Sequence, residues 1–210
     1  MSVGPPALPP LLLLTDRLQV PADRGMAEVI AAAVGAGARA VVVRERDLED
    51  HERAELVSDL RKVMAPVGGT LVVAAPTVGR PVGVHLRRGD PPPRTRPVLL
   101  GRSCHDATEL ARAAAEGCDY VTLSPVASSA SKPGHGPALG PEGFAELAQQ
   151  TGDAHGRRPA MYALGGVTPY NAGDWLAAGA DGVAVMGGVM RADDPGAVVE
   201  DLLHALSVAA

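Results

Sequence analysis

Short apolar runs alternate with longer amphipathic stretches along almost the whole chain. The runs are apolar at consecutive positions, which is typical of strands buried on both faces of a parallel sheet. The stretches between them carry apolar residues at helical spacing, as in Ala22–Gly35. This alternation predicts repeated strand–helix units and a parallel sheet.

Eight strands are expected, over Leu11–Thr15, Ala40–Val43, Gly69–Ala75, Gly83–Leu86, Val98–Ser103, Tyr120–Leu123, Ala160–Leu164 and Gly182–Met186. The expected helices are Ala22–Gly35, Glu49–Met64, Ala107–Glu116, Pro141–Gln150, Pro169–Ala178 and Pro195–Val208. Eight parallel strands separated by helices close into a barrel more readily than they form an open sheet. We therefore expect an α/β fold with a single (β/α)8 TIM-barrel domain over residues 11–210, preceded by a loose N-terminal tail at residues 1–10.

Helices are not expected around the fourth strand. The segments 75–81 and 87–97 are short and rich in proline, so the barrel should have reduced helices between strands three and five. A bare sheet flank would be costly in water. We therefore expect a homodimer with this arc of the barrel near its interface.

Composition and charge exclude several classes of protein. The chain has 210 residues, enough for one sizeable core, and a formal net charge of -5 with 2% aromatic residues, so a nucleic-acid surface is not expected. The run Leu11–Leu14 is too short to span a membrane. The two cysteines, Cys104 and Cys118, have no metal-site spacing and predict reduced thiols in a cytoplasmic protein.

Two glycine pairs mark the last two expected strands. Gly165-Gly166 follow one strand and Gly187-Gly188 follow the next. Backbone N–H groups at such turns can hold a phosphate, and barrels commonly bind phosphate after strands seven and eight. Thr168 and Pro169 suit the cap and first position of the helix between the two pairs.

Polar residues follow most of the other strands, at the end of a barrel where chemistry occurs. Charged residues fill 44–47, His85 and Asp90 follow strand four, and Ser103 lies at the end of strand five. A loop with hydroxyl groups and a lysine, 124–136, follows strand six.

Seven motifs occur in order: LTDR at 14–17, VRERD at 43–47, GVHLRRGD at 83–90, GRSCH at 101–105, SPVASSASKPGHG at 124–136, LGGVTPYN at 164–171 and ADGVAVMGGVM at 180–190. Together they cover nearly the whole chain, and the chain resembles the thiamine-phosphate synthase / TenI family. The resemblance implies a transferase of thiamine biosynthesis. It would couple a pyrimidine methyl diphosphate to a thiazole phosphate and release pyrophosphate, with Mg2+ as cofactor.

The resemblance also implies roles for individual residues. Arg44, Arg46 and Lys132 would bind pyrophosphate, and Ser103 would donate a hydrogen bond to it. Asp90 would ligate Mg2+. The thiazole phosphate would be bound by Ser129, Ser131, Gly165, Gly166, Gly187 and Gly188.

Departures from the family pattern leave two alternatives open. Synthases carry Asn-Asp-Arg where this chain has Ala74-Ala75-Pro76, and Gln where it has Val42. One alternative is a TenI-type thiazole tautomerase. That family's catalytic His follows strand six, where this chain has Pro125, so His85, His105 or His135 would have to replace it. The other alternative is a non-catalytic binder of phosphorylated ligands.

Overall fold

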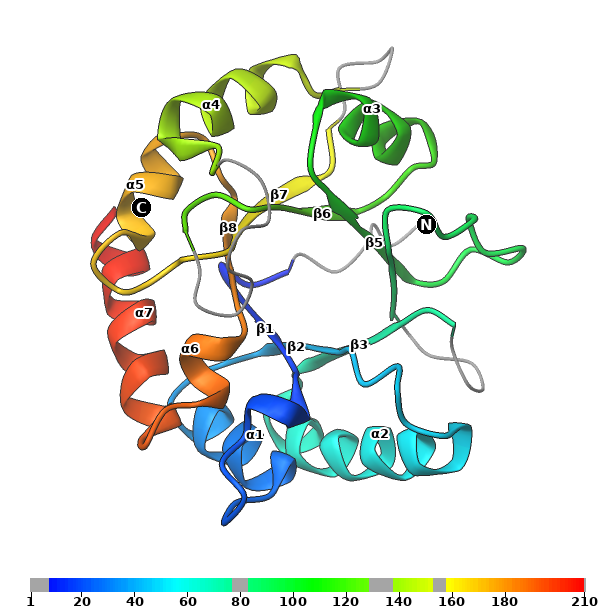
Figure 1. Cartoon of the computed structure of the whole chain (residues 1–210), viewed down its shortest axis with the longest axis vertical. Helices are drawn as coiled ribbons and strands as arrows, with labels where there is room; N and C mark the ends of the chain where they lie inside the picture. Colours follow the sequence, from blue (N-terminus) through cyan, green and yellow to red (C-terminus); the bar gives the residue numbers. More distant parts are fainter. Residues whose placement is uncertain (1–7, 77–82, 129–137, 153–157, 210) are drawn as a thin grey trace.

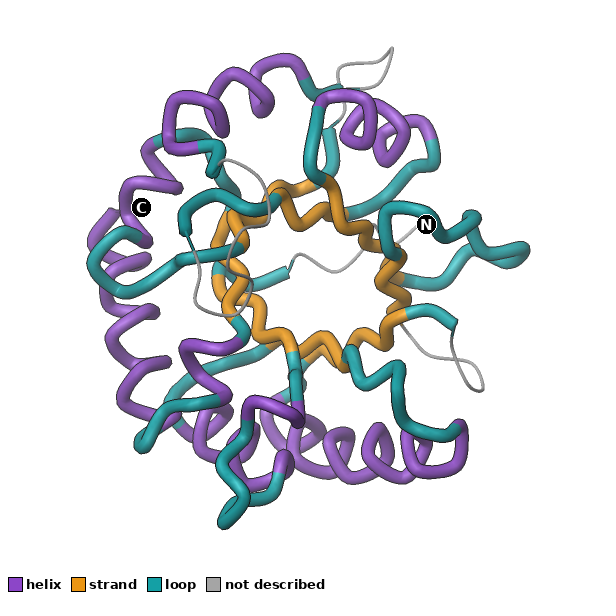
Figure 2. The backbone as a smooth tube through the Cα atoms, in the orientation of Figure 1, coloured by secondary structure: helices purple, strands orange, loops and turns teal. Residues whose placement is uncertain are grey.

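Eight parallel strands form a closed barrel with helices on its outside (Figures 1 and 2). The computed structural model describes residues 8–76, 83–128, 138–152 and 158–209. Each strand pairs with the next along the chain, and β1 pairs with β8 to close the ring. The expected (β/α)8 barrel is therefore confirmed.

The strands are β1 (Leu11–Leu14), β2 (Ala40–Val43), β3 (Thr70–Ala74), β4 (Gly83–Leu86), β5 (Leu99–Cys104), β6 (Tyr120–Leu123), β7 (Ala160–Leu164) and β8 (Gly182–Val185). The helices are α1 (Met26–Gly35), α2 (Asp50–Met64), α3 (Ala107–Ala115), α4 (Gly140–Gln150), α5 (Ala172–Ala177), α6 (Gly187–Met190) and α7 (Pro195–Ala209). Two short 3-10 turns, η1 (Arg17–Gln19) and η2 (Ala65–Val67), complete the described elements.

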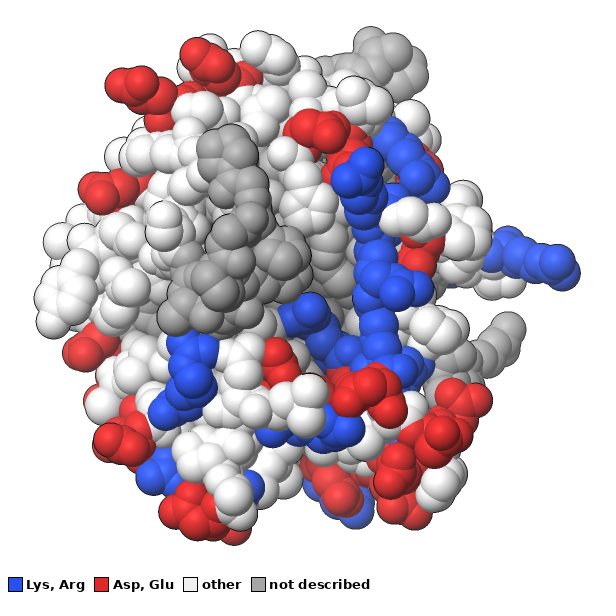
Figure 3. All heavy atoms as spheres, viewed as in Figure 1, with Lys and Arg blue, Asp and Glu red and all other residues white. Residues whose placement is uncertain are grey.

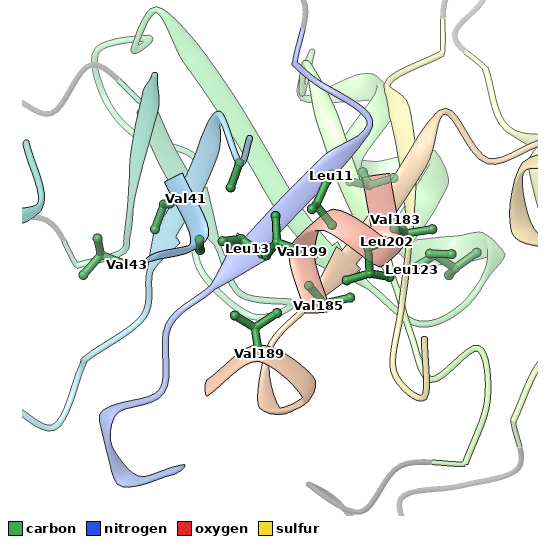
Figure 4. Close-up of a cluster of buried hydrophobic side chains, with 14 of the residues drawn as sticks. Leu11, Leu13, Val41, Val43, Leu123, Val183, Val185, Val189, Val199 and Leu202 are labelled. Atoms are coloured by element: carbon green, nitrogen blue, oxygen red, sulfur yellow. The ribbon is translucent and has the colours of Figure 1, made fainter. Parts of the chain in front are cut away.

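Side chains of the strands alternate between two apolar clusters. The outward-facing ones pack against the helices: Leu11, Val183 and Val185 of β1 and β8 share a cluster with Val199 and Leu202 of α7 (Figure 4). A smaller inner cluster fills the barrel. It contains aliphatic residues from β1 to β3, and Tyr120 and Tyr162 on the opposite side. The filled interior leaves the chemistry to the strand ends.

The residues directly before β1 differ from the expected loose tail. The Tyr162 hydroxyl donates to the Pro9 carbonyl at 2.9 Å, and the Val183 N–H donates to the Pro10 carbonyl at 2.8 Å. Leu8 packs against the inner cluster. Residues 8–10 therefore belong to the amino end of the barrel, and residues 1–7 lie outside the described residues.

The barrel wall between β3 and β5 has fewer helices, as expected. Residues 87–98 between β4 and β5 form no helix, because four prolines interrupt them. The idea of a bare flank is wrong, however. The outward side chains Val84, Leu86 and Leu100 are all buried, at 7%, 2% and 2% exposure. The apolar surface that suggested a dimer interface is thus already covered within one chain, and the homodimer stays a prediction.

A buried arginine holds this irregular segment against the barrel. Arg102 of β5 faces outward and is fully buried. Its guanidinium donates to the carbonyls of Arg87, Arg88 and Asp90 at 2.7, 3.1 and 3.0 Å. It also pairs with the Glu116 carboxylate at 2.5 Å. The segment 87–90 therefore takes the place of a helix on this flank.

Two expectations for the last βα units need correction. The helix expected at Pro169–Ala178 begins only at Ala172, because Thr168 and Pro169 form a turn: the Thr168 N–H donates to the Asn171 side chain at 2.8 Å. Gly187 and Gly188 do not form an open loop but begin the short helix α6.

Two further expectations concern membranes and thiols. Among the described residues, no helix is long and apolar enough to cross a membrane. Both cysteines are free and buried, and burial raises the pKa of the Cys118 thiol to about 11.

Candidate active site

The charged motif after β2 is held by contacts with the end of β1. Thr15 accepts the Arg44 N–H on its hydroxyl at 3.0 Å. The buried Glu45 carboxylate accepts the Arg17 N–H, and the Arg17 guanidinium pairs with Asp47 at 2.7 Å. The two acidic residues of the motif are thus engaged by Arg17, and the motif's own arginines are turned to other partners.

Arg44 connects this motif to the end of β8. Its guanidinium donates to the sulfur of Met186, the residue before Gly187-Gly188. β2 and β8 are both neighbours of β1 in the closed barrel. The arginine expected to bind pyrophosphate and one glycine pair expected to bind the thiazole phosphate are therefore brought to the same part of the barrel rim.

Arg46 lies in a strongly positive environment. Burial and the nearby Arg87 guanidinium lower the pKa of Arg46 from 12.5 to about 10, and Asp90 opposes this shift. The guanidinium reaches the Asp90 carboxylate only at 3.9 Å. Its Nε is buried and has no hydrogen-bond partner among the described residues. Arg46 remains charged at neutral pH and is suited to an anionic ligand.

Ser103 is held by a hydrogen-bonded chain inside the barrel. His85 contacts the Tyr120 hydroxyl through Nδ1 at 2.9 Å and the Ser103 hydroxyl through Nε2 at 2.8 Å. Burial, with Arg46 and Arg44 nearby, lowers the pKa of His85 to about 3, so the ring is neutral. Burial also raises the pKa of Tyr120, which therefore keeps its proton.

The neutral ring fixes the direction of this chain. Within the described residues His85 is the one partner of the Tyr120 hydroxyl, so Tyr120 donates to Nδ1. His85 must then donate from Nε2 to the Ser103 oxygen. The Ser103 proton is left free for an acceptor at the strand ends, which is the role expected for this residue.

The buried neutral histidine predicts acid sensitivity. In the unfolded chain His85 takes up a proton below its ordinary pKa near 6.5, whereas the folded state resists protonation down to about 3. Stability should therefore fall as pH is lowered through this window, by about 1.4 kcal/mol per pH unit for this one group. In urea titrations between pH 6 and 4, His85→Gln should flatten the slope by that amount. The control variant His204→Gln, at an exposed position, should show the same slope of stability against pH as the parent. An unchanged slope in His85→Gln would contradict the assignment of His85 as a buried neutral histidine.

The glycine pairs offer backbone donors, but they differ in geometry. Gly165 and Gly166 have φ of 99° and 70°, and a Cβ on Gly166 would lie 2.5 Å from the Ser128 carbonyl oxygen. Gly188 has open space around it. Among the described residues, none accepts from the N–H groups of the four glycines. Free N–H groups at two adjacent strand ends fit a phosphate.

The remaining expected residues lie outside the described part of the chain. These are Ser129, Ser131 and Lys132, together with His135 of the tautomerase alternative. Their expected roles stay predictions.

The donors around Asp90 do not fit a protein-held Mg2+. The Asp90 carboxylate accepts the Arg87 N–H at 2.8 Å and pairs with the Arg87 guanidinium at 3.1 Å. The end of β3 contributes Ala74 and Ala75, which have no side-chain oxygen. Within the described residues no group of three His, Cys, Asp or Glu side chains could hold a metal ion. Mg2+ binds through carboxylates that are free to coordinate it, and Asp90 is engaged by Arg87, so the described residues do not fit the metal role expected for Asp90.

The histidines of the tautomerase alternative are placed differently from each other. His85 is buried and both its nitrogens are engaged, so it is unsuited to act as a base. His105 is exposed, and its Nδ1 lies 2.7 Å from the Ser124 carbonyl oxygen, next to Pro125. His105 is therefore the better replacement for a histidine after strand six.

Three contributors to the site were not foreseen from the sequence: Tyr120, Arg87 and Arg102. Tyr120 orients His85, Arg87 engages Asp90, and Arg102 fixes the segment that carries both Arg87 and Asp90. Because side chains alternate along β5, Arg102 points to the outer face of the barrel and Ser103 to the inner face. The outer face normally packs against a helix, so the lack of a helix at this place in the sequence was the signal that could have indicated the role of Arg102.

Comparisons with known proteins show the family to which the chain belongs. A family model described as thiamine monophosphate synthase matches residues 11–189. The thiamine-phosphate synthase of Chloroflexus aurantiacus is 31% identical over 208 residues, covering 91% of this chain and 93% of that protein. The corresponding protein of Chromobacterium violaceum is 34% identical over 192 residues, covering 86% and 88%.

Solved structures show the same fold. The thiamine phosphate pyrophosphorylase of Pyrococcus furiosus superposes with a TM-score of 0.75 at 22% identity, covering 95% of this chain and 96% of that one. The family-model match spans most of the chain, and two relatives exceed 30% identity over nearly their whole lengths. On this evidence the chain belongs to the thiamine monophosphate synthase (TMP-TENI) family.

Proposed function

We propose that the protein is a thiamine-phosphate synthase, which joins a pyrimidine methyl diphosphate to a thiazole phosphate. The observation that carries the proposal is the strand order: Arg44 and Arg46 follow β2, Gly187-Gly188 follow β8, and both strands neighbour β1 in the closed barrel. Through it, a group of arginines suited to a diphosphate and a glycine pair suited to a phosphate lie at one end of the same barrel. A reaction between two phosphorylated substrates needs both kinds of anion site close together.

The reaction requires little covalent chemistry from the protein. The bond between the pyrimidine methylene carbon and the diphosphate oxygen breaks, and its electron pair leaves with the oxygen. The lone pair of the thiazole nitrogen forms the new C–N bond, so pyrophosphate and a thiazolium product result. Negative charge grows on the departing oxygen, where Arg46 and the free Ser103 proton can stabilise it.

The proposal is tested by incubating the purified protein with both substrates. Release of pyrophosphate and formation of a product with the summed mass, less pyrophosphate, would support it. The control is Arg158→Ala, since Arg158 pairs with Asp181 before β7 and β8, at the other end of the barrel. If the parent protein releases no more pyrophosphate than an Arg44→Ala, Arg46→Ala variant, the proposed synthase activity is wrong.

Gly188 allows ligand binding to be separated from folding. Gly188→Ala adds a methyl group in open space within α6, so the melting temperature should stay the same or rise. Affinity for the thiazole phosphate, measured by calorimetry, should fall by about tenfold as the methyl group obstructs the approach to the backbone donors. Gly35→Ala is the matched control: Gly35 also has open space around it, and it ends α1 away from the site. Equal phosphate affinity in all three proteins would remove α6 from the phosphate site.

A thiazole tautomerase is the second candidate, favoured by the position of His105. Donation from Nδ1 to the Ser124 carbonyl leaves Nε2, beside the end of β6, without a hydrogen-bond partner among the described residues. The test is proton exchange on the thiazole phosphate, followed by NMR. Exchange that is abolished by His105→Ala, but not by the matched His204→Ala, would establish this activity, and no exchange in the parent would refute it.

A further inference from the structure

We propose that Arg87, together with Arg46, supplies the positive charge that binds and activates the diphosphate group, so that this protein does not depend on a protein-held Mg2+. The inference rests on the proposed synthase function and deepens it. It assigns to Arg87 a direct contact with the diphosphate and follows from the guanidinium groups around Asp90.

Positive charges outnumber negative ones around Arg46. The positive charges of Arg44, Arg53 and Arg87 all act on Arg46. Asp90 is the anion with the largest effect on Arg46. The carboxylate of the neighbouring Glu45 is already used by the Arg17 backbone. This excess of positive charge is destabilising in the free protein, and a polyanion would relieve it.

Arg87 lies directly beside the Asp90 carboxylate. Its guanidinium and backbone N–H hold Asp90 by contacts of 2.8 to 3.1 Å, so it occupies the carboxylate that a metal ion would need. The Arg87 side chain is 57% exposed. A guanidinium has five N–H donors, so those not facing Asp90 remain free for phosphate oxygens.

The segment that bears Arg87 is held in place by two further arginines. The carbonyls of Arg88 and Asp90 each accept from both Arg102 and Arg112, at 3.0 to 3.1 Å. Exposed Lys and Arg side chains form a band over part of the face seen in Figure 3. A preorganised group of arginines stabilises developing charge without having to rearrange during the reaction.

The arginines need not accept or donate a proton or an electron when the C–O bond breaks. The electron pair of the broken bond goes to the diphosphate oxygen, and no proton or electron is taken from the protein. The guanidinium groups stay protonated and act as hydrogen-bond donors and positive charges. The thiazole nitrogen supplies the pair for the new bond, as in the proposed reaction.

The test is calorimetric titration of inorganic pyrophosphate into the full-length protein, once in EDTA and once in millimolar Mg2+. Pyrophosphate should bind in EDTA, and Mg2+ should strengthen binding by less than tenfold. Arg87→Ala should weaken binding in EDTA by about 10- to 100-fold. The control, Arg158→Ala, should bind as the parent does, because its ion pair lies at the other end of the barrel.

Asp90→Asn separates the two interpretations even if Arg87→Ala folds poorly. An asparagine oxygen can still accept the Arg87 N–H, so the segment should keep its shape, while Arg87 is released from an ion pair. Binding in EDTA should be as tight as in the parent or tighter. The inference is overturned if pyrophosphate binds only with Mg2+, if Mg2+ strengthens binding tenfold or more, or if Asp90→Asn weakens binding.

Failure of the synthase proposal would look different. In that case pyrophosphate would bind without Mg2+, but the two substrates would give no product under either condition. Conversely, product formation that is as fast in Arg87→Ala as in the parent would support the synthase and refute the role of Arg87.

Discussion

Replacing Arg102 by methionine should lower the free energy of unfolding by about 3 kcal/mol. Arg102 is the largest fully buried side chain, and its guanidinium is bound to three carbonyls and the Glu116 carboxylate. Methionine fills a similar volume but donates nothing, so the Arg87 carbonyl loses this donor. This loss of unfolding free energy is near the low end of the range for breaking a buried ion pair, because Arg112 still contacts Glu116.

Arg112→Met is the matched control for this prediction. Arg112 shares Glu116 and the carbonyls of Arg88 and Asp90 with Arg102, but its side chain is 43% exposed. Its loss should cost less than about 1 kcal/mol, as for other exposed pairs. Urea denaturation measures both values, and hydrogen exchange should report faster exchange at residues 87–90 in Arg102→Met alone. Equal costs in the two variants would show that burial of Arg102 does not matter.

The barrel was predictable because its strands are short, mostly apolar runs that are buried on both faces. The ranges of β2, β4, β6 and β7 agree with the sequence expectations at both ends. Residues on both faces of these strands are buried, so glycine, proline or charge marks where each strand ends. The helix before β8 was placed wrongly for a local reason. Asn171 accepts the Thr168 N–H and donates to the Gly166 carbonyl, so this segment closes the glycine turn before α5 begins.

The site was predictable only as far as it follows the strand order. Arg44, Arg46, Ser103 and the glycine pairs all occur at carboxyl ends of strands, where the barrel brings them together. The pairing of charges could not be predicted, because it depends on distances between loops. Glu45 binds the Arg17 backbone, and Asp90 binds Arg87, the residue directly after β4. These two contacts decide which arginines remain available to a ligand.

The interior contacts of β4 to β6 were hidden for a different reason. The alternation of side chains along the strands places His85, Ser103 and Tyr120 inside the barrel, but it does not show which of them are in contact. His85 meets both others because β5 lies between β4 and β6, and Tyr120 reaches across it. A histidine at this position has a structural explanation and a functional one, and here the two coincide: it is buried, and it leaves the Ser103 proton free.

Removing the Arg46 guanidinium should have the largest effect on catalysis. Arg46→Ala should lower kcat by about 100- to 1000-fold, equivalent to roughly 3–4 kcal/mol of transition-state stabilisation, because charge grows on the diphosphate as the C–O bond breaks. KM should change much less, since the other arginines still attract the substrate. Steady-state pyrophosphate release measures both constants. Arg61→Ala, on the exposed end of α2, should leave them unchanged.

Stability distinguishes this role from a structural one. Burial and the repulsion from Arg87 lower the pKa of Arg46 to about 10, so the fold disfavours the charge that this residue carries at neutral pH. Its nearest anion, Asp90, is 3.9 Å away and already bound by Arg87 at 3.1 Å. Arg46→Ala should therefore keep or raise the melting temperature while activity collapses. A variant that loses stability and activity together would place Arg46 among the residues that stabilise the barrel rim. If only activity is lost, Arg46 carries a charge that destabilises the fold, as expected for a residue that binds a polyanion.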